Sequence, residues 1–473
     1  MPAWFQARKE EMMGKLFGTD GIRGIANQYP MTPQLGVNLG MAIVHFLGNG
    51  NPTILLGRDT RISGPMLEFA LASGLLSEGA TVLHAGVLPT PGVAYMTREM
   101  EAEAGVVISA SHNPHEHNGF KIFSSQGTKL TEEEELELER ILFSFSPEKE
   151  QHHEKGQMRE PGHSQILDDA TQRYVSFLMG AAPELEDLRD MKIVLDCANG
   201  ATYRVAPELF QRLNADVVAL AIDPDGKNIN KACGSQHPEY VGQKVVETGS
   251  TLGLAFDGDG DRLVAVDEYG HALSGDQLLV IFAKMLKEQD RLKKNMVVST
   301  VMSNIGLRVA LRDLGIEHKA TKVGDRNVFQ EMLAHGAILG GEESGHILLL
   351  NHHSTGDGLL SALYVISAMQ YFDRPLSELS DLMPLFPQVL INVRVSKKPP
   401  LSQLPEVQGL IEAVEQELGG KGRVLVRYSG TENLCRVMVE GEDENKVKGY
   451  AEDIAAAVAK AVAYSNSSDS SVG

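Results

Sequence analysis

The chain has 473 residues, enough for several domains, and its hydrophobic content of 42% is ordinary for a globular protein with large cores. Its net charge of −20 argues against nucleic acid or an anionic membrane as a partner, and an anionic ligand would need a local basic pocket. The three cysteines are too scattered for a disulfide framework or a zinc site, so we expect a reduced, cytoplasmic protein.

The two ends of the chain differ in composition from the rest. Residues 1–15 carry acidic side chains and lack a long apolar core, so we expect an extension before the first strand rather than a signal peptide. Residues 465–473 are rich in serine, which favours disorder. No apolar run in the sequence approaches the length of a membrane span.

Short apolar runs that lead into polar loops recur along most of the chain, each followed by a segment with helical periodicity. We expect strands at residues 53–56, 105–108, 192–195, 252–256, 296–299 and 337–339. This alternation predicts α/β domains, in which ligands gather outside the carboxyl ends of the strands. The pattern recurs about every hundred residues, an ordinary domain size, so we expect three similar α/β domains.

The second of these strands leads into a loop with a serine that could carry chemistry. Ser111 follows the strand directly, so its hydroxyl can face a cleft, although such serines more often serve as turn formers. A Ser-His hydrolase is disfavoured because Ser111 and His112 are adjacent and no G-x-S-x-G elbow is present. Lys121 lies near enough in sequence to face the same loop. It could act as a base if neighbouring cations lowered its pKa, and otherwise it is a surface lysine.

Three aspartates alternate with glycines in the loop after the strand at residues 252–256, in the sequence Asp257-Gly258-Asp259-Gly260-Asp261-Arg262. Carboxylates at every second position can converge on one hard cation, and the glycines permit the tight turn that this needs. The arginine offers a bidentate donor for a phosphate beside the metal. The loop therefore predicts a metal and phosphate site at the end of a sheet.

The aspartate loop has two alternative interpretations. A calcium loop between two helices would fit the aspartates at loop positions 1, 3 and 5 and Glu268 at position 12. However, Arg262 stands where that motif requires glycine, and residues 252–256 and 263–266 on the two sides read as strands. A solvated acidic turn is the remaining alternative.

The last predicted strand of the α/β part leads into a loop with side chains suited to a sugar. Glu342, Ser344 and His346 occupy alternate positions, so all three can face one side of an extended segment. Together they could hydrogen-bond a polyhydroxylated ligand.

A smaller α+β module follows the prolines at residues 384–387. We expect strands at 388–395, 422–427 and 434–440 and helices at 401–418 and 442–464. Its loop offers a cation, two hydroxyls and a glycine amide from Arg427, Ser429, Gly430 and Thr431. This set suits a phosphate monoester, and the alternative is an ordinary hairpin turn.

Taken together, these loops resemble those of the α-D-phosphohexomutase family, from about residue 13 to residue 463. The motifs that carry the resemblance occur in the family's order: Gly18–Gly24, Ser109–Pro114, Asp257–Arg262, Gly341–His346 and Arg427–Glu432. Residues 15–24, 233–239 and 323–326 are most similar to the bacterial branch that acts on glucosamine phosphates.

The resemblance implies a fold of class α/β, with three similar α/β domains with mixed sheets and a smaller α+β C-terminal domain, arranged around a central cleft. We expect the domains at residues 1–166, 167–268, 269–385 and 386–473. Each domain would contribute one loop to the cleft.

The resemblance also implies a role for each candidate residue. Ser111 would carry a phosphoryl group and, with Asp257, Asp259 and Asp261, would bind Mg2+. The reacting phosphoryl would be surrounded by Arg23, Arg262, Lys121 and His346, with Lys121 and His346 as candidates for proton transfer. The sugar hydroxyls would bind Glu342 and Ser344, and the second phosphate would bind Arg427, Ser429, Gly430 and Thr431.

The implied activity is the interconversion of glucosamine 6-phosphate and glucosamine 1-phosphate through a sugar bisphosphate, which feeds amino-sugar nucleotide and cell-wall precursor synthesis. The partner is a small-molecule sugar phosphate, without nucleic acid or membrane, and a homodimer is the expected assembly. Members of this branch usually carry Gln where this chain has Glu343, and often Lys and Pro where it has Tyr428 and Asn433. Glucose or mannose phosphates are therefore the alternative substrates. A metal-dependent phosphatase or a sugar-phosphate sensor is the third possibility.

Overall fold

A computed structural model describes residues 16–18, 20–48, 50–145, 160–185, 187–429 and 433–462 of the chain. The expectations for the N-terminal extension, for the serine-rich tail, and for Gly430 and Thr431 lie outside these residues. The chain divides into two compact units. Unit 1 has the bounds Met1–Met302 and Ile316–Leu382, and unit 2 has the bounds Ser303–Gly315 and Met383–Gly473. Within the described ranges, no helix combines the length and apolarity needed to cross a bilayer.

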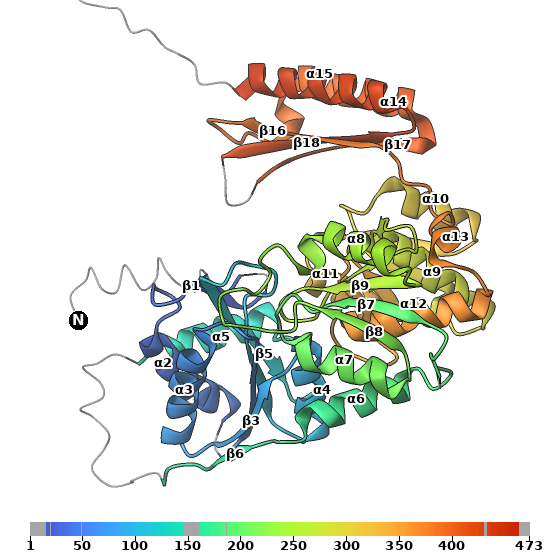
Figure 1. The fold of residues 1–473 in the computed structure, drawn as a ribbon. Coiled ribbons are helices and arrows are strands. Elements are labelled where there is room, and N and C mark those ends of the chain that lie inside the picture. The colour runs from blue at the N-terminus through green and yellow to red at the C-terminus, as the bar shows by residue number, and fades with distance from the viewer. Residues whose placement is uncertain are drawn as a thin grey trace, which may run out of the picture. The chain divides into compact units, whose positions relative to one another are not determined.

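The first sheet of unit 1 has six strands in the order β1-β5-β4-β2-β3-β6 (Figure 1). Strands β2, β3, β4 and β6 run parallel, whereas β5 is antiparallel to β4 and to β1. All of β4 is buried, as expected for a parallel strand covered on both faces. The strands are β1 (Ile22–Ile25), β2 (Thr53–Arg58), β3 (Thr81–Val87), β4 (Ala104–Ile108), β5 (His117–Ser124) and β6 (Ser164–Ile166).

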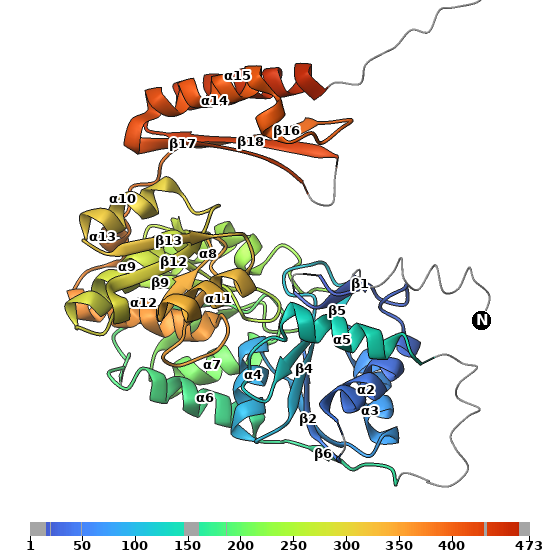
Figure 2. The ribbon, with the colours of Figure 1, turned by 180° about the vertical axis from the view of Figure 1, so that it is seen from behind.

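Helices cover both faces of this sheet. Helix α2 packs against α3 and α5 on one face, and α4 lies on the other face in both Figure 1 and Figure 2. Thr131 starts α5 with a capping box: its side chain accepts from the Glu134 amide, and the Glu134 carboxylate accepts from the Thr131 amide. The helices are α2 (Pro33–Leu47), α3 (Gly64–Ser77), α4 (Thr90–Glu99) and α5 (Glu132–Leu142).

The close packing of α2 on α3 depends on glycine. A Cβ atom at Gly74 would lie 2.0 Å from the carbonyl oxygen of Val37, and one at Gly40 would lie 2.3 Å from that of Leu71. Backbone atoms cannot yield as the end of a side chain can. The two helices therefore approach each other only because both positions lack a side chain.

We expect Gly74→Ala to destabilise unit 1 by about 3 kcal/mol, because the new methyl group forces α2 and α3 apart. The matched control is Gly180→Ala in α6 (Ala170–Ala181), where a Cβ meets nothing within 4 Å. That control should be neutral or stabilising by up to about 1 kcal/mol. Urea unfolding of the two variants tests this, and equal midpoints would contradict the packing argument.

The second sheet has five strands in the order β11-β10-β9-β7-β8. Strand β7 is parallel to β8 and β9, and β10 is antiparallel to β9 and β11. The side chains of Val241 and Val245 pack on this sheet from α8. The elements are α6, β7 (Lys192–Asp196), α7 (Thr202–Arg212), β8 (Asp216–Leu220), α8 (Pro238–Thr248), β9 (Leu252–Phe256), β10 (Leu263–Val266) and β11 (Ala272–Leu273).

The third sheet has four strands in the order β13-β12-β14-β15. Strand β12 is parallel to β13 and β14, and β15 is antiparallel to β14. Its elements are α9 (Gly275–Glu288), β12 (Met296–Thr300), β13 (Glu317–Thr321), α11 (Asp325–His335), β14 (Leu339–Gly341), β15 (Ile347–Leu349), α12 (Gly358–Phe372) and α13 (Leu376–Ser380).

Strand β14 differs from its prediction. The apolar run indicated residues 337–339, but the strand begins at Leu339 and includes Gly340 and Gly341. Pairing decides these bounds, because both glycines are registered between β12 and β15. A Cβ at Gly340 would lie 2.8 Å from the Val298 carbonyl oxygen, so the glycines suit a crowded strand rather than a loop.

Unit 2 contains a three-stranded antiparallel sheet in the order β16-β18-β17, with α15 packed on it. The helix predicted at residues 401–418 corresponds to α14, which begins only at Pro405, after a 3-10 turn at Leu401–Gln403. It begins there because proline suits the first helical position. The elements are α10 (Ile305–Asp313), β16 (Gln388–Arg394), α14 (Pro405–Leu418), β17 (Gly422–Tyr428), β18 (Leu434–Gly441) and α15 (Glu444–Val462). A further 3-10 turn of unit 2 is Gly419–Lys421, and unit 1 has 3-10 turns at Gly234–Gln236 and Lys293–Asn295.

These sheets confirm the predicted fold class of three α/β domains with mixed sheets and a smaller α+β domain. The domain boundaries at residues 166, 268 and 385 stay predictions.

Candidate active site

Ser111 lies where the loop after β4 meets the aspartate loop after β9. Its hydroxyl donates a hydrogen bond of 2.6 Å to Oδ2 of Asp257, although the two residues are 146 positions apart. Its backbone is in the left-handed region with φ of 51°, and its amide donates to Oγ of Ser109 at 2.9 Å. A non-glycine residue in this region is uncommon and needs support from its surroundings.

That support comes from Arg61, which the sequence analysis did not single out. Its guanidinium is fully buried and donates to the carbonyl oxygens of Ser111 and Asn113 at 2.8 Å each and of His117 at 3.0 Å. Asp59 accepts from Arg61 Nε at 2.8 Å and balances the buried charge. Arg61 therefore fixes the backbone of the serine loop through several bonds from one rigid group.

A second support reaches the serine loop from the domain with the second sheet. Asn230 Nδ2 donates to the carbonyl oxygens of Ser111 at 2.9 Å and of Asn113 at 3.1 Å. Beneath it, a Cβ at Gly258 would lie 2.6 Å from the Ser111 carbonyl oxygen. The first glycine of the aspartate loop is thus required because the two loops touch through their backbones.

The three aspartates form a compact cluster of oxygens. One carboxylate oxygen from each of Asp257, Asp259 and Asp261 lies within 4.8 Å of the others, and all three residues are buried. Oδ1 of Asp259 and Oδ1 of Asp261 are buried without a hydrogen-bond partner among the described residues. Orphaned buried oxygens on converging carboxylates fit a hard divalent cation, so the donor set suits a metal ion.

The electrostatics of the cluster point the same way. Burial raises the pKa of Asp257 well above its usual range, and the charges of Asp261 and Asp259 add to this shift. The loop is flanked by the antiparallel strands β9 and β10, which excludes the helix-loop-helix calcium motif. Its burial excludes the solvated acidic turn.

Lys121 and Thr90 hold the aspartate loop from the first domain. Lys121 Nζ donates to Asp259 at 2.7 Å and to Asp261 at 3.2 Å, and Thr90 Oγ1 donates to Asp259 at 2.6 Å. Burial alone would lower the pKa of Lys121, but Asp20, Asp259 and Asp261 outweigh burial and raise it well above its usual range. The lowered pKa that Lys121 would need to act as a base is therefore absent in this arrangement. Its ammonium group instead donates hydrogen bonds.

His346 lies between two carboxylates. Its Nδ1 is 3.6 Å from Asp261 Oδ1, and its Nε2 is 3.6 Å from Asp325 Oδ2, which are ion-pair rather than hydrogen-bond distances. Burial would lower the pKa of His346, but the charges of Asp261 and Asp325 outweigh burial and raise it. The ring is also enclosed by Gly356, where a Cβ would lie 2.4 Å from Nε2.

The loop before His346 is a turn, so the expected alternation of Glu342, Ser344 and His346 along one side of an extended segment is wrong. The Gly345 amide donates to the Glu342 carbonyl oxygen at 3.0 Å, and Gly345 has φ of 85°. His346 is buried, whereas Ser344 and Glu343 are exposed. Glu342 is half-buried and accepts from the Gly324 amide at 3.0 Å.

Two arginines add positive charge around Ser111. Arg23 on β1 pairs with Asp20, and Arg262 follows the aspartate loop with its amide bonded to Asp257 Oδ1 at 3.2 Å. Burial, followed by the charges of Arg262 and Arg23, lowers the pKa of His112 to about 4. The imidazole beside Ser111 is therefore neutral, and the charges of both guanidinium groups act on it.

The predicted phosphate loop lies in unit 2. Arg427 on β17 is paired directly opposite Arg436 on β18, which places two guanidinium side chains on one face of the sheet. Lys398 Nζ donates to the Ser429 carbonyl oxygen at 2.7 Å. Neighbouring like charges are unfavourable by themselves and suit a bound anion. Arg436 and Lys398 were not predicted, because strand register brings Arg436 opposite Arg427 and the segment after β16 brings Lys398 to Ser429.

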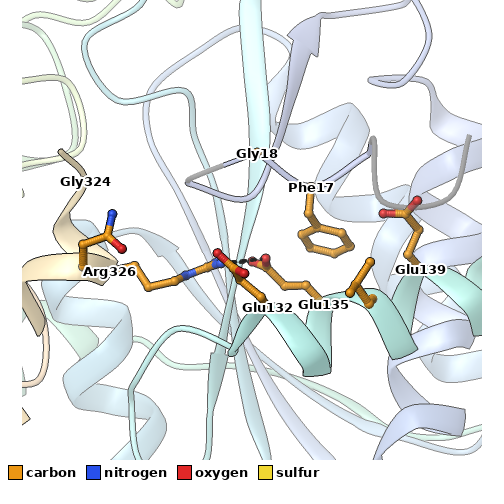
Figure 3. A pocket seen from close by; sticks show the side chains of 9 residues that line it. Phe17, Gly18, Glu132, Glu135, Glu139, Gly324 and Arg326 are labelled. Atoms are coloured by element: carbon orange, nitrogen blue, oxygen red, sulfur yellow. Dashed lines mark hydrogen bonds and ion pairs between the residues drawn. The ribbon is translucent and has the colours of Figure 1, made fainter. Parts of the chain in front are cut away.

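A cavity of about 430 Å³ lies beside the site in unit 1 (Figure 3). Its described lining residues are Phe17, Gly18, Glu132, Glu135, Leu136, Glu139, Gly324, Arg326 and Asn327. Three of these are glutamates, and Arg326 points toward Glu135 and pairs with it in Figure 3. This acidic lining disfavours a phosphate group, so the cavity is not the centre of a phosphoryl transfer site.

Comparisons with known proteins agree along the whole chain. Models of the phosphoglucomutase/phosphomannomutase family match at residues 14–149 (alpha/beta/alpha domain I), 172–270 (domain II), 274–386 (domain III) and 390–457 (C-terminal domain). The phosphoglucosamine mutase of Syntrophus aciditrophicus (strain SB) is 52% identical over 94% of this chain and 98% of that protein. The one of Syntrophobacter fumaroxidans (strain DSM 10017 / MPOB) is 50% identical over 95% of this chain and 100% of that protein.

Solved structures share the fold at lower identity. A phosphoglucomutase/phosphomannomutase family protein from Burkholderia thailandensis aligns with a TM-score of 0.78 and 24% identity, over 94% of this chain and 97% of that one. N-acetylphosphoglucosamine mutase of Aspergillus fumigatus, solved with GlcNAc-6P and magnesium, aligns with a TM-score of 0.67 and 17% identity, over 98% of this chain and 100% of that one.

Proposed function

Because the chain belongs to the phosphoglucomutase/phosphomannomutase family, we propose that it interconverts glucosamine 6-phosphate and glucosamine 1-phosphate. Relatives of about this length and close to half identical are phosphoglucosamine mutases. The product is a precursor for amino-sugar nucleotide and cell-wall synthesis. The observation that carries the proposal is the 2.6 Å bond between the Ser111 hydroxyl and Asp257 inside a buried cluster of aspartates and basic side chains.

In the proposed reaction, phospho-Ser111 donates its phosphoryl group to one sugar hydroxyl. The bond from phosphorus to Ser111 Oγ breaks as the bond to the sugar oxygen forms, and a sugar bisphosphate results. The bisphosphate turns over, and its other phosphate returns to Ser111. Phosphoryl transfer requires alignment and neutralisation of charge more than covalent assistance.

The residues around Ser111 supply both requirements. Arg61 and Asn230 hold the serine backbone, so the phosphoryl donor is aligned before substrate binds. Arg23 and Arg262 are proposed to neutralise the transferring group. Lys121 or His346, each protonated at the outset, is proposed to give its proton to the Ser111 oxygen as the bond to phosphorus breaks, and the same group then takes up the proton that the sugar hydroxyl loses.

The three aspartates are proposed to hold Mg2+, together with Ser111 in its phosphorylated form. Carboxylate ligands with two buried oxygens that lack a hydrogen-bond partner among the described residues favour a small hard cation. When bound, such a cation supplies the neutralisation of charge that the aspartate cluster and the phosphoryl group otherwise lack.

The sugar and its second phosphate are assigned to the other loops. Glu342 and Ser344 are proposed to bind the sugar hydroxyls. Arg427 and Ser429, with Gly430 and Thr431, are proposed to bind the phosphate that is not transferred. The pairing of Arg427 with Arg436 supports an anion at that loop.

We further propose that the enzyme is cytoplasmic and acts on a small molecule, without nucleic acid or membrane. The net charge of −20 supports the proposed lack of nucleic-acid and membrane partners, because it repels polyanions and anionic lipid surfaces. A homodimer is proposed as the assembly, and sedimentation velocity would test it.

The test of the proposed function is the conversion of glucosamine 6-phosphate followed by phosphorus NMR, with a trace of sugar bisphosphate as primer and with Mg2+. We expect glucosamine 1-phosphate to accumulate, and intact mass to show one phosphoryl group on Ser111. Release of inorganic phosphate alone would favour a phosphatase. No turnover with any hexose phosphate would overturn the proposal.

Glucose or mannose phosphate is the second candidate substrate, because Glu343 departs from the glutamine usual in glucosamine-phosphate enzymes. Glu343 is exposed on the turn between β14 and β15. A carboxylate there can attract the 2-ammonium group of glucosamine, which glucose lacks.

We expect Glu343→Gln to lower the preference for glucosamine 6-phosphate over glucose 6-phosphate by about fivefold in kcat/KM, because an exposed ion pair contributes roughly 1 kcal/mol at most. Glu317→Gln, also exposed and in the same sheet, is the matched control and should leave the ratio unchanged. An unchanged ratio in Glu343→Gln would remove this residue from substrate discrimination.

A further inference from the structure

Six charged side chains of unit 1 form a closed ring of alternating sign beside Ser111. Lys121 is 3.1 Å from Asp20 and 3.2 Å from Asp261, and His346 is 3.6 Å from both Asp261 and Asp325. Lys129 closes the ring by donating to Asp20 Oδ1 and to Asp325 Oδ2. In order, the ring is Asp20, Lys129, Asp325, His346, Asp261 and Lys121.

Lys129 is the basic member of the ring that no part of the proposed mechanism uses. It lies between β5 and α5, its side chain is only 13% exposed, and its two bonds go to carboxylates of different domains. Burial alone would lower the pKa of Lys129, but Asp20 and Asp325 outweigh burial and raise it. An ammonium is therefore held between two half-buried carboxylates, which compensate a charge that is largely removed from water.

A second ion pair lies next to the one between Lys129 and Asp325, and it is formed by the next residue of α11. Arg326 is paired with Glu135 of α5 through both guanidinium nitrogens, which Figure 3 shows beside the cavity. Asp325 and Arg326 thus form two neighbouring ion pairs that connect α11 to the first domain. In one pair α11 supplies the carboxylate, and in the other it supplies the guanidinium. The first turn of α11 is fixed to the first domain, and Asp325 is fixed with it.

We propose that Lys129 is a positioning residue for phosphoryl transfer, which sets the places of Lys121 and His346 through Asp20 and Asp325. This inference rests on the proposed function. Asp20 uses Oδ1 for Lys129 and Oδ2 for Lys121 and Arg23, so the lysine fixes the orientation of that carboxylate. Asp325 uses Oδ2 for both Lys129 and His346.

The charges explain why loss of Lys129 would disturb the reacting groups. Without the ammonium, Asp20 and Asp325 are left as half-buried carboxylates with one counterion fewer between them. Asp20 then attracts Lys121 and Arg23 more strongly and Asp325 attracts His346 more strongly, so both Lys121 and His346 are drawn away from Asp261. A displacement of about 1 Å in catalytic groups costs on the order of 10²-fold in rate.

The test compares Lys129→Met, which keeps the length of the side chain without its charge, with Lys129→Arg, which keeps the charge. We expect Lys129→Met to lower kcat about 10²-fold with KM changed less than about threefold, because the sugar-binding loops are intact. Lys129→Arg should recover at least about tenfold of that loss. Binding of Mg2+ measured by calorimetry should not weaken, because Lys129 does not contact the aspartate cluster and its loss draws two cations away from Asp261.

The matched control is Lys192→Met, at a half-buried lysine whose Nζ donates to the Thr248 carbonyl oxygen at 3.2 Å. It should keep wild-type kcat and KM. If Lys129→Met does not fold, the double variant Lys129→Met with Asp325→Asn replaces it, since it removes the orphaned charge. Positioning predicts that its kcat stays low in folded protein, whereas wild-type kcat there would overturn the inference.

Wild-type kcat in folded Lys129→Met would also overturn it, as would equal losses in Lys129→Met and Lys129→Arg. These results differ from failure of the proposed function, in which the wild-type protein itself does not convert glucosamine 6-phosphate.

Discussion

Ser111→Ala is expected to abolish the mutase reaction, with turnover below about 10⁻⁴ of the wild-type value. The hydroxyl is the proposed carrier of the phosphoryl group, and no other serine or threonine hydroxyl among the described residues is bonded to Asp257. Alanine removes one oxygen and leaves the backbone bonds from Arg61 and Asn230 in place, so the protein should remain folded. Phosphorus NMR of the sugar phosphates measures the rate, and intact mass measures the phosphoryl group.

Ser77→Ala is the control for loss of a serine hydroxyl. Its Oγ donates to the Gly74 carbonyl oxygen at 2.8 Å within α3, away from the aspartate loop. The control should keep full turnover and the phosphoryl group. Ser111→Ala that still converts the substrate would show that another group carries the phosphoryl. Continued hydrolysis without isomerisation would favour a phosphatase with an aspartate nucleophile.

Asp257→Asn is expected to reduce activity by about 10³-fold and to weaken Mg2+ binding at the same time. The amide keeps the volume of the side chain and can still accept from Ser111, but it removes one of three charged ligands. Activity as a function of Mg2+ concentration should shift to higher concentration, and calorimetry should show the weaker binding directly.

The same substitution should raise the unfolding midpoint of the protein in the presence of a metal chelator. The folded state raises the pKa of Asp257, so ionisation of this buried group at neutral pH costs stability. Replacing it with a neutral amide removes that cost, and the stabilisation should vanish at a pH low enough to protonate the carboxyl. Gain of stability with loss of function is the signature of a charged ligand cluster.

Asp267→Asn is the control, since Asp267 is also buried but accepts from the amides of Tyr269 at 2.9 Å and His271 at 2.8 Å in a turn. It should leave Mg2+ binding unchanged. Unchanged activity and metal binding in Asp257→Asn would remove that residue from the proposed metal site.

Most of the strands that were predicted agree with the structure within two residues, because each is a contiguous apolar run ended by glycine, proline or a polar loop, whereas strands such as β3, β5 and β8 were not predicted. It also predicted the nearness of Ser111 to the aspartate loop, although that step came from the resemblance of ordered motifs rather than from spacing. The prediction was wrong where pairing overrides composition. Gly340 and Gly341 read as a loop but form a strand, and Glu342 to His346 read as extended but turn.

The sequence by itself therefore determined the order of the sheets and the chemical character of each loop, since strand periodicity and motif residues are local properties of the chain. The tertiary structure alone decided which charged side chains lie beside groups that are distant in the sequence. Lys129 with Asp325, Arg61 with the serine carbonyls, and Arg427 with Arg436 meet only through domain packing or strand register. Such contacts depend on how whole elements dock, and no short stretch of sequence records that.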